Sequence, residues 1–217
     1  LLRHGSEEQK QRYLPDIAAG ELRLQAFGVT EPGSGTDTTR IRTRAVRDGD
    51  SYVINGSKIW TSYGHYADWM FCLVRTDPDA KKQEGISFLL IDMATPGIRV
   101  EPIRHFYGAH VFNQIFFEDV RVPVANRVGA ENQGWTVAKS LLEHERLGSA
   151  RHSEARRKLG RLRRILAEGQ GVTAGLQSDS HWRSRVAQLD TRIRALQIST
   201  MRALEAMDRS EPVLVVA

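Results

Sequence analysis

The chain of 217 residues is 41% hydrophobic and 26% charged and carries a formal net charge of +5, which is ordinary for a globular protein of one or two domains. No apolar run approaches the roughly 20 residues that a bilayer span requires, so we expect no membrane partner. The single cysteine, Cys72, excludes an internal disulfide framework and favours a reducing, cytoplasmic compartment. The N-terminus has no Met and no signal-peptide pattern, so we expect the chain to begin within a longer protein.

The first predicted element is a helix that begins after Ser6 and ends near Gly20. Ser6 suits the N-cap position, and the side chain of Gln9, three residues later, can complete a capping box. Pro15 is expected to disturb this helix locally.

From Arg23 to about Val124 the pattern changes to short runs rich in Val, Ile, Phe and Trp, which are separated by turn residues and predict an all-β domain. Asp48-Gly49-Asp50 suits a hairpin turn, and Asn55-Gly56 is predicted to form another turn. Several of the expected strands are continuously apolar, so we expect them to be central in the sheet. The full set of expected strands is Ile41–Arg47, Tyr52–Asn55, Lys58–Thr61, Ala67–Thr76, Ile86–Asp92 and Val111–Phe117.

After Pro123 the β pattern ends, and two helices are predicted. The first helix is expected from Glu131 to about Glu168. The second helix is expected over Ser180–Met207, and Glu211-Pro212 is expected to end it. Residues 146–209 hold 14 Lys and Arg against 6 Asp and Glu. This basic charge could attract nucleic acid or coenzyme phosphates, but we favour an exposed helix face and expect no nucleic-acid partner.

The most informative segment follows the apolar run Leu24–Val29 and reads Gly28-Val-Thr-Glu-Pro-Gly-Ser-Gly-Thr-Asp37. Gly33 and Gly35 can take positive φ and let a ligand approach the backbone closely. Hydroxyl side chains and consecutive N–H groups in such a turn suit anionic or carbonyl oxygens. An ordinary glycine-rich turn is the alternative, and a second motif downstream, Lys58-Ile-Trp-Thr-Ser62, weighs against it.

Two common motifs are absent. The segment Gly33-x-Gly35-x-x-Thr38 lacks the third glycine of a dinucleotide fingerprint, and strands rather than a helix follow it. His144-Glu145-Arg146-Leu147-Gly148 lacks the second His that a zinc-binding helix requires four residues on. We therefore expect no bound metal.

Together the segments Gly28–Asp37 and Lys58–Ser62 resemble motifs of the acyl-coenzyme A dehydrogenase family of flavoproteins. The resemblance continues through Gly85–Ile91, Phe117–Pro123 and Gly134-Trp135, and it thins beyond Arg146. It implies an α+β multi-domain fold with a helix, a central all-β domain and part of a C-terminal helical bundle. The implied parts are the last helix of an N-terminal helical domain at 1–22, the β-domain at 23–128 and the first half of the bundle at 129–217.

The resemblance also implies an FAD site that is formed by the two motifs. Trp60 would lie beside the isoalloxazine ring with the Ser62 hydroxyl near N5, and Thr36 would lie near the acyl thioester. Donors fixed near the ring nitrogens would tune the electronics of the flavin. The implied cofactor-binding residues are Phe27, Val29, Thr30, Gly35, Thr36, Trp60, Thr61 and Ser62.

The implied reaction needs a base, because a proton must leave the carbon α to the thioester. A desolvated carboxylate with a raised pKa suits this task. Most family members carry the glutamate in the second half of the bundle, and a minority carry it on the first bundle helix, immediately before an Arg. Glu145 stands at that position, with Arg146 as the implied substrate-binding residue. The alternatives are a glutamate beyond residue 217 as the base, and an ion-pair role for Glu145.

The activity that the resemblance implies is FAD-dependent α,β-dehydrogenation of an acyl-CoA thioester to a 2,3-enoyl-CoA. Electrons would pass to an electron-transferring flavoprotein, and the protein would be a homo- or hetero-oligomer. Lys58–Tyr63 and Leu142–Arg146 resemble a bacterial branch that includes the pimeloyl-CoA dehydrogenase large subunit and heteromeric enzymes of sterol side-chain breakdown. A non-catalytic subunit of a heteromeric dehydrogenase and a flavin oxidase of the same superfamily remain open as alternatives.

Overall fold

A computed structural model describes the backbone of residues 1–148 and 151–209, and the side chains of 1–142 and 151–209. The chain divides into two compact units, which comprise residues 1–140 and 141–217. None of the described helices is long and apolar enough to cross a membrane.

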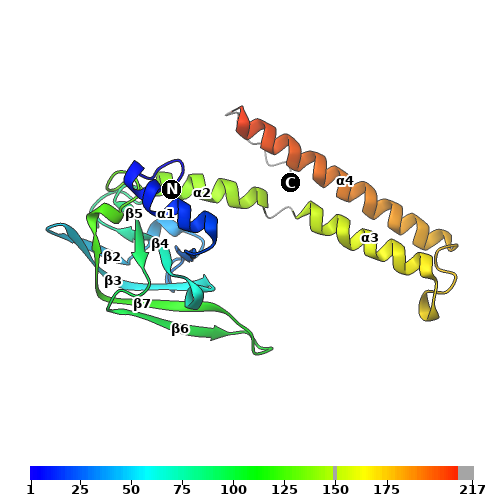
Figure 1. The fold of residues 1–217 in the computed structure, drawn as a ribbon, viewed down its shortest axis with the longest axis horizontal. Helices are drawn as coiled ribbons and strands as arrows, with labels where there is room; N and C mark the ends of the chain where they lie inside the picture. Colours follow the sequence, from blue (N-terminus) through cyan, green and yellow to red (C-terminus); the bar gives the residue numbers. More distant parts are fainter. Residues whose placement is uncertain (149–150, 210–217) are drawn as a thin grey trace. The chain divides into compact units, whose positions relative to one another are not determined.

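The first unit contains one complete helix, the first part of a second helix, α2 (Gly134–Gly148), and a seven-stranded sheet, drawn in blue to green in Figure 1. The strands run in the order β1-β4-β2-β3-β7-β6, and β5 pairs with the other edge of β4. β4 lies parallel to β1 and β2, and every other pairing is antiparallel. The elements are α1 (Glu7–Ala19), β1 (Leu24–Gly28), β2 (Arg44–Asp48), β3 (Ser51–Ser62), β4 (Trp69–Arg75), β5 (Ile86–Asp92), β6 (Ile98–Arg104) and β7 (His110–Pro123). Three short 3-10 helices join them: η1 (Thr38–Arg40), η2 (Gly64–Tyr66) and η3 (Val124–Asn126).

The capping box that the sequence predicts is confirmed at the start of α1. The Ser6 hydroxyl accepts from the Gln9 N–H, and the Gln9 Oε1 accepts from the Ser6 N–H, both at 3.2 Å. The same Gln9 side chain donates to the backbone carbonyls of Ala125 and Arg127 at 2.8 and 2.9 Å. One buried amide therefore starts the helix and also joins it to the end of the β-domain.

Among the continuously apolar runs, β4 is a central strand with both faces buried, as predicted, whereas β5 is buried on both faces but lies at an edge of the sheet, where β4 is its one strand partner. Met70, Cys72 and Val74 of β4 face one core cluster inside the sheet. Leu73, between them, faces a second cluster that also contains Tyr13 of α1. Successive side chains of a strand point to opposite faces, so a strand with a core on each side needs no polar alternation.

One prediction about the strands is wrong. Asn55-Gly56 does not form a turn, because β3 continues through it with an irregular register against β7. Gly56 has φ +144°, and a Cβ there would come within 2.7 Å of the Thr43 Cα, so the glycine permits a close approach of two backbones. The sequence also did not predict β6, which pairs only with β7 and carries Pro102, a residue that edge strands tolerate.

Within its described residues, the second unit contains the end of α2 and two further helices, α3 (His152–Glu168) and α4 (Ser180–Asp208), which pack side by side and are joined through η4 (Gly171–Thr173). The predicted second helix, Ser180–Met207, is confirmed, whereas Glu211-Pro212 lies outside the described residues. The predicted single helix over 131–168 is wrong: α2 (Gly134–Gly148) and α3 are separate helices, and Arg151 precedes α3 with φ +42°. The order of one helix, a β-domain and further helices confirms the predicted α+β fold.

Candidate functional site

The glycine-rich segment is a compact turn that follows β1. The backbones of Glu31 and Ser34 exchange two hydrogen bonds of 3.0 and 3.2 Å, and the Ser34 hydroxyl donates to the Asp37 carbonyl at 2.7 Å. Gly33 and Gly35 do not take positive φ, contrary to the expectation for this turn, and a Cβ on either would meet no atom within 4 Å. Because neither glycine carries a side chain, no side chain projects from the outer surface of the turn at these two positions.

Among the three glycines of this segment, Gly28, where β1 ends, is the one that a larger residue cannot replace without a shift of its neighbours. It stands opposite Cys72 in the parallel β1–β4 pair. A Cβ at this position would lie 2.8 Å from the Cys72 Sγ and 3.0 Å from the Met70 Sδ. The absence of a side chain lets the turn begin directly above the buried core.

Trp60 has the most unusual conformation of the second motif. It lies in β3 with φ +64°, in the left-handed region that non-glycine residues seldom occupy. The register against β7 shifts between Lys58 and Thr61, so one extra residue is accommodated there as a bulge. The Trp60 residue is 53% exposed, and its indole forms a T-shaped pair with the Phe112 ring, with the ring centroids 5.9 Å apart. The bulge thus turns a large aromatic ring toward the outside of the sheet.

Hydrogen bonds join the glycine-rich turn to this bulge. The Ile59 N–H donates to the Thr30 carbonyl at 2.8 Å, and the Lys58 ammonium donates to the Val29 carbonyl at 3.3 Å. Two motifs that are thirty residues apart in the sequence therefore form one site in the structure.

A buried ion pair lies beneath the junction. The Lys58 side chain is fully buried, and its Nζ lies 2.8 Å from the Oε1 of Glu31, which is 7% exposed. The Glu31 carboxylate also accepts from the Arg42 N–H at 2.6 Å and the Thr43 N–H at 2.9 Å. Burial alone raises the pKa of Glu31, but Lys58 and the two backbone donors outweigh it, so this pKa is lowered overall.

A second polar cluster lies on the other side of the bulge. The Asn113 side chain, fully buried on β7, donates to the Thr61 carbonyl at 3.0 Å. It also contacts one ring nitrogen each of His65, at 3.1 Å, and His110, at 2.7 Å. The two imidazole rings stack with their centroids 3.8 Å apart. The strand is therefore held by buried polar side chains both before and after Trp60.

The predicted cofactor-binding residues thus lie together in the first unit. Gly35, Thr36 and Ser62 are exposed, whereas Thr61 is buried and points its hydroxyl into the sheet without a partner there. Phe27, Val29 and Thr30 are half-buried. Glu145 and Arg146 fall on α2, but their side chains lie outside the described residues.

Sequence reasoning missed three residues that hold this site. Glu31 was read only as part of a motif, and Lys58 and Asn113 were not singled out. A lysine within an otherwise apolar strand pattern is a signal for Lys58, because a buried ammonium requires an acceptor. Nothing in the spacing of the sequence indicates Asn113, which reaches the bulge only through the pairing of β3 with β7.

The exposed groups of the site fit a large, partly aromatic, phosphate-bearing ligand such as FAD. The hydroxyls of Thr30, Thr36 and Ser62 donate to no other residue in the part of the chain whose side chains are described, so they are available to a ligand. The exposed Trp60 indole offers a surface for ring stacking. The open turn at Gly33 and Gly35 lets a ligand approach the backbone.

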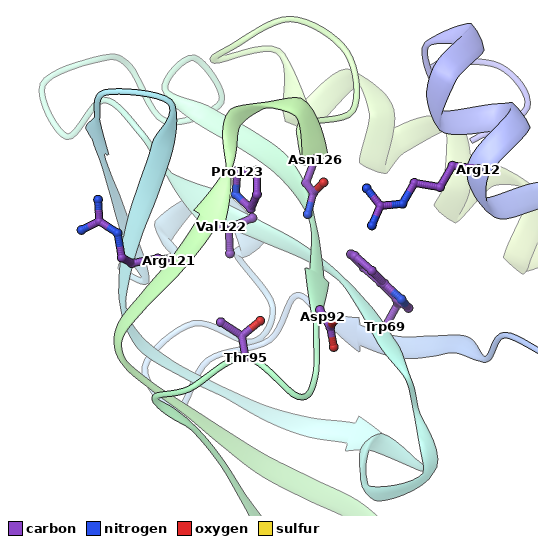
Figure 2. A pocket seen from close by; sticks show the side chains of 8 residues that line it. All are labelled: Arg12, Trp69, Asp92, Thr95, Arg121, Val122, Pro123 and Asn126. Carbon is purple, nitrogen blue, oxygen red and sulfur yellow. The ribbon is translucent and has the colours of Figure 1, made fainter.

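A separate hollow of about 210 Å³ opens between α1 and the β-domain, and Arg12 and Asn126 point into it (Figure 2). The Arg12 guanidinium lies over the rings of Tyr13 and Trp69, at 5.1 and 5.6 Å from their centroids. None of its lining residues belongs to the glycine-rich turn or to the bulge. We therefore place the candidate site at the turn and the bulge.

Among the side chains that the structure describes, no three His, Cys, Asp or Glu gather as metal ligands.

Comparison with known proteins connects this site to one enzyme family. A family model for the acyl-CoA dehydrogenase middle domain matches residues 26–120, and one for the acyl-CoA dehydrogenase C-terminal domain matches residues 132–217. Acyl-CoA dehydrogenase FadE26 of Mycobacterium tuberculosis is 47% identical over 150 residues, which are 68% of this chain and 37% of the relative. Acyl-CoA dehydrogenase IpdE1 of Mycolicibacterium smegmatis is 34% identical over 98% of this chain and 55% of the relative.

Solved structures agree with these matches. The ChsE4-ChsE5 complex of Mycobacterium tuberculosis contains a chain that is 36% identical, with a TM-score of 0.84 over 97% of this chain and 54% of that chain. A structure titled as the Tcur3481-Tcur3483 steroid ACAD is 35% identical, with a TM-score of 0.87 over 97% of this chain and 53% of that one. This chain thus spans at most about half of the length of these relatives. It belongs to the acyl-CoA dehydrogenase family.

Proposed function

We propose that the protein carrying this chain is an FAD-dependent acyl-CoA dehydrogenase that converts an acyl-CoA thioester to its 2,3-enoyl form. The observation that carries the proposal is the 2.8 Å hydrogen bond from the Ile59 N–H to the Thr30 carbonyl, which places the glycine-rich turn against the exposed Trp60. It supports the proposal because it joins the two family motifs into one surface of hydroxyl donors and an aromatic ring.

The residues of this surface would have separate roles. Bound FAD would supply the electron acceptor that the reaction needs. Trp60 would stack on the ring system, and the Ser62 hydroxyl would donate to a ring nitrogen. Phe27, Val29, Thr30, Gly35 and Thr36 would line the cofactor through backbone groups and side chains, with Thr36 also near the thioester and Thr61 supporting the strand from beneath.

Glu145 on α2 is our proposed base for the α-proton, and Arg146 is our proposed substrate contact. Both assignments rest on the match of this segment to the family pattern. A carboxylate in an apolar, water-excluded site keeps its proton affinity high enough to remove a weakly acidic proton. We also keep the domain limits 1–22, 23–128 and 129–217 as a proposal.

We further propose a homo- or hetero-oligomer that passes electrons to an electron-transferring flavoprotein and works in the cytoplasm. Two of the similar structures, ChsE4-ChsE5 and Tcur3481-Tcur3483, are named as pairs of proteins. This favours a second candidate function, in which the chain belongs to a subunit that contributes its fold but no catalytic base to a heteromeric dehydrogenase. A flavin oxidase is a further alternative, and oxygen consumption with acyl-CoA would identify it.

The test is to purify the full-length protein alone and with a companion subunit, and to record its flavin absorbance before and after anaerobic addition of acyl-CoA. We expect bound FAD and loss of its visible absorbance on substrate addition. Bleaching that occurs only after the companion subunit is added would favour the non-catalytic subunit, whereas FAD binding without bleaching in both preparations would contradict the dehydrogenase.

Trp60→Ala provides a sharper test of the site. Loss of one aromatic stacking contact of about 1 kcal/mol should raise the Kd for FAD roughly fivefold. Trp182→Ala, which removes another partly exposed indole, on α4, is the matched control and should leave this Kd unchanged. Equal affinities for wild type and Trp60→Ala would remove Trp60 from the site.

A further inference from the structure

The buried ion pair between Lys58 and Glu31 links three segments of the β-domain. Lys58 belongs to β3, and Glu31 belongs to the glycine-rich turn. The Glu31 carboxylate also accepts hydrogen bonds from the N–H groups of Arg42 and Thr43, which belong to the segment that enters β2. Both oxygens of the carboxylate are engaged. With the Lys58 bond to the Val29 carbonyl, the pair fixes both of these segments relative to β3.

Stability alone is a poor explanation for such a pair. Removing two charges from water is costly, and apolar residues of similar volume often replace a buried ion pair at no loss of stability. A buried ion pair instead fixes the relative orientation of the segments that carry it, because its hydrogen bonds are satisfied in one arrangement only. The location of the pair therefore suggests what it positions.

The pair is adjacent in sequence to the groups that would face a ligand. Glu31 follows Thr30 directly, and Lys58 is the last residue in regular register with β7 before the bulge at Trp60. The register resumes at Thr61, whose carbonyl is held by Asn113. The left-handed backbone of Trp60 is thus fixed at both ends, which is how a strained conformation of this kind persists.

We propose that Lys58 and Glu31 are positioning residues, which clamp the glycine-rich turn to the Trp60 bulge and so preform one ligand cradle before any ligand binds. The inference rests on the proposed function for the identity of the ligand, FAD, but the preformed cradle is a property of the protein alone. Preorganisation raises affinity because the binding site does not have to be ordered at the moment of binding.

The first test is amide hydrogen exchange of the wild-type, full-length protein with and without FAD. A preformed cradle requires the N–H groups of Arg42, Thr43 and Ile59 to be protected in the apoprotein already, and any further protection by FAD should be no larger at these three groups than at the N–H groups of β4. Protection that develops only after FAD is added would overturn the proposal. If FAD does not bind at all, the proposed function fails, while the apoprotein exchange still decides whether the cradle is preformed.

The second test uses the double variant Lys58→Met/Glu31→Gln, which removes both charges and keeps an acceptor for one of the two backbone N–H groups. We expect exchange at Ile59 to accelerate and the Kd for FAD to rise about tenfold, with a shifted visible spectrum of the bound flavin. Lys10→Met, which breaks the exposed 2.7 Å pair with Glu7 on α1, is the control and should change neither. A double variant that is less stable, yet has wild-type exchange at Ile59 and a wild-type flavin spectrum, would show that the pair is only structural.

Discussion

Cys72 lies on β4, where its side chain faces the core inside the sheet and is fully buried. Burial raises the pKa of its thiol to about 11, with Lys58 opposing this and Glu31 adding to it. At pH 8 only about a thousandth of the thiol would be ionised, and the thiolate is the reactive form. We therefore expect iodoacetamide to leave Cys72 unmodified in the native protein and to modify it completely in guanidinium chloride, as measured by mass spectrometry. Rapid native labelling would show that the β4 core opens.

Gly28 offers a second test at the scale of single residues. A methyl group there would press on the Cys72 Sγ at 2.8 Å, so Gly28→Ala should lower the free energy of unfolding by about 1–3 kcal/mol. Gly33→Ala is the matched control, because its Cβ would meet nothing within 4 Å. Urea denaturation measures both. Cys72→Ala in the Gly28→Ala background should recover part of the loss, and the absence of recovery would mean that the strain lies elsewhere.

At the scale of elements, the connection between the glycine-rich turn and β3 should depend on pH. The folded pKa of Glu31 is lowered, so its contribution to stability is fully present above the unfolded value of about 4.3 and is lost as the pH falls through the folded pKa. Glu31→Gln leaves Lys58 buried without its counter-ion and should cost about 3–5 kcal/mol at pH 7.

Urea denaturation of wild type and Glu31→Gln from pH 7 to pH 3 checks this expectation. The difference between the two proteins should begin to narrow below about pH 4, because the Glu31 carboxylate of the unfolded wild type is then protonated, and it should narrow further as the pH falls toward the lowered pKa of the folded protein. Glu7→Gln, which removes an exposed carboxylate on α1, should follow the wild type at every pH. A constant difference across the range would mean that the charge of Glu31 does not contribute.

The elements that sequence reasoning predicted are those whose signals are local. The capping box at Ser6 and the hairpin at Asp48-Gly49-Asp50 depend on residues within four positions of each other, and both are confirmed. β6 was missed because its stability comes from pairing with β7, and Pro102 with charged neighbours masks the strand pattern. Gly56 was misread because the local pattern of a turn is the same as that of a bulge that admits the backbone of Thr43.

The candidate site was predictable only in part, for the same reason. The turn and the Trp60 strand were identified from residue types, but the residues that unite them lie far apart in the chain. Lys58 meets Glu31 across 27 positions, and Asn113 meets Thr61 across 52. The left-handed backbone of Trp60 has no sequence signal at all, since it follows from the register shift against β7.

At the scale of the whole molecule, the proposed chemistry is divided between two parts of the chain. The first unit carries the groups that suit a flavin, and the proposed base, Glu145, belongs to the second unit, residues 141–217. A substitution in the first unit should therefore affect flavin binding, whereas a substitution of Glu145 should affect removal of the α-proton. A variant that retains the flavin but loses proton abstraction would distinguish the two parts, which a truncation would not.

Glu145→Gln in the full-length protein is that variant. It removes a carboxylate that can accept the α-proton, and it leaves the turn and the Trp60 bulge unchanged. We expect normal FAD content and a loss of anaerobic flavin bleaching of at least about 100-fold, because positioned general bases contribute roughly 10²–10⁴-fold to rate. Glu143→Gln, two positions away and on a different face of the helix, is the control and should bleach at nearly the wild-type rate. Full bleaching at the wild-type rate in Glu145→Gln would move the base beyond residue 217, whereas equal losses in both variants would indicate that α2 tolerates neither change.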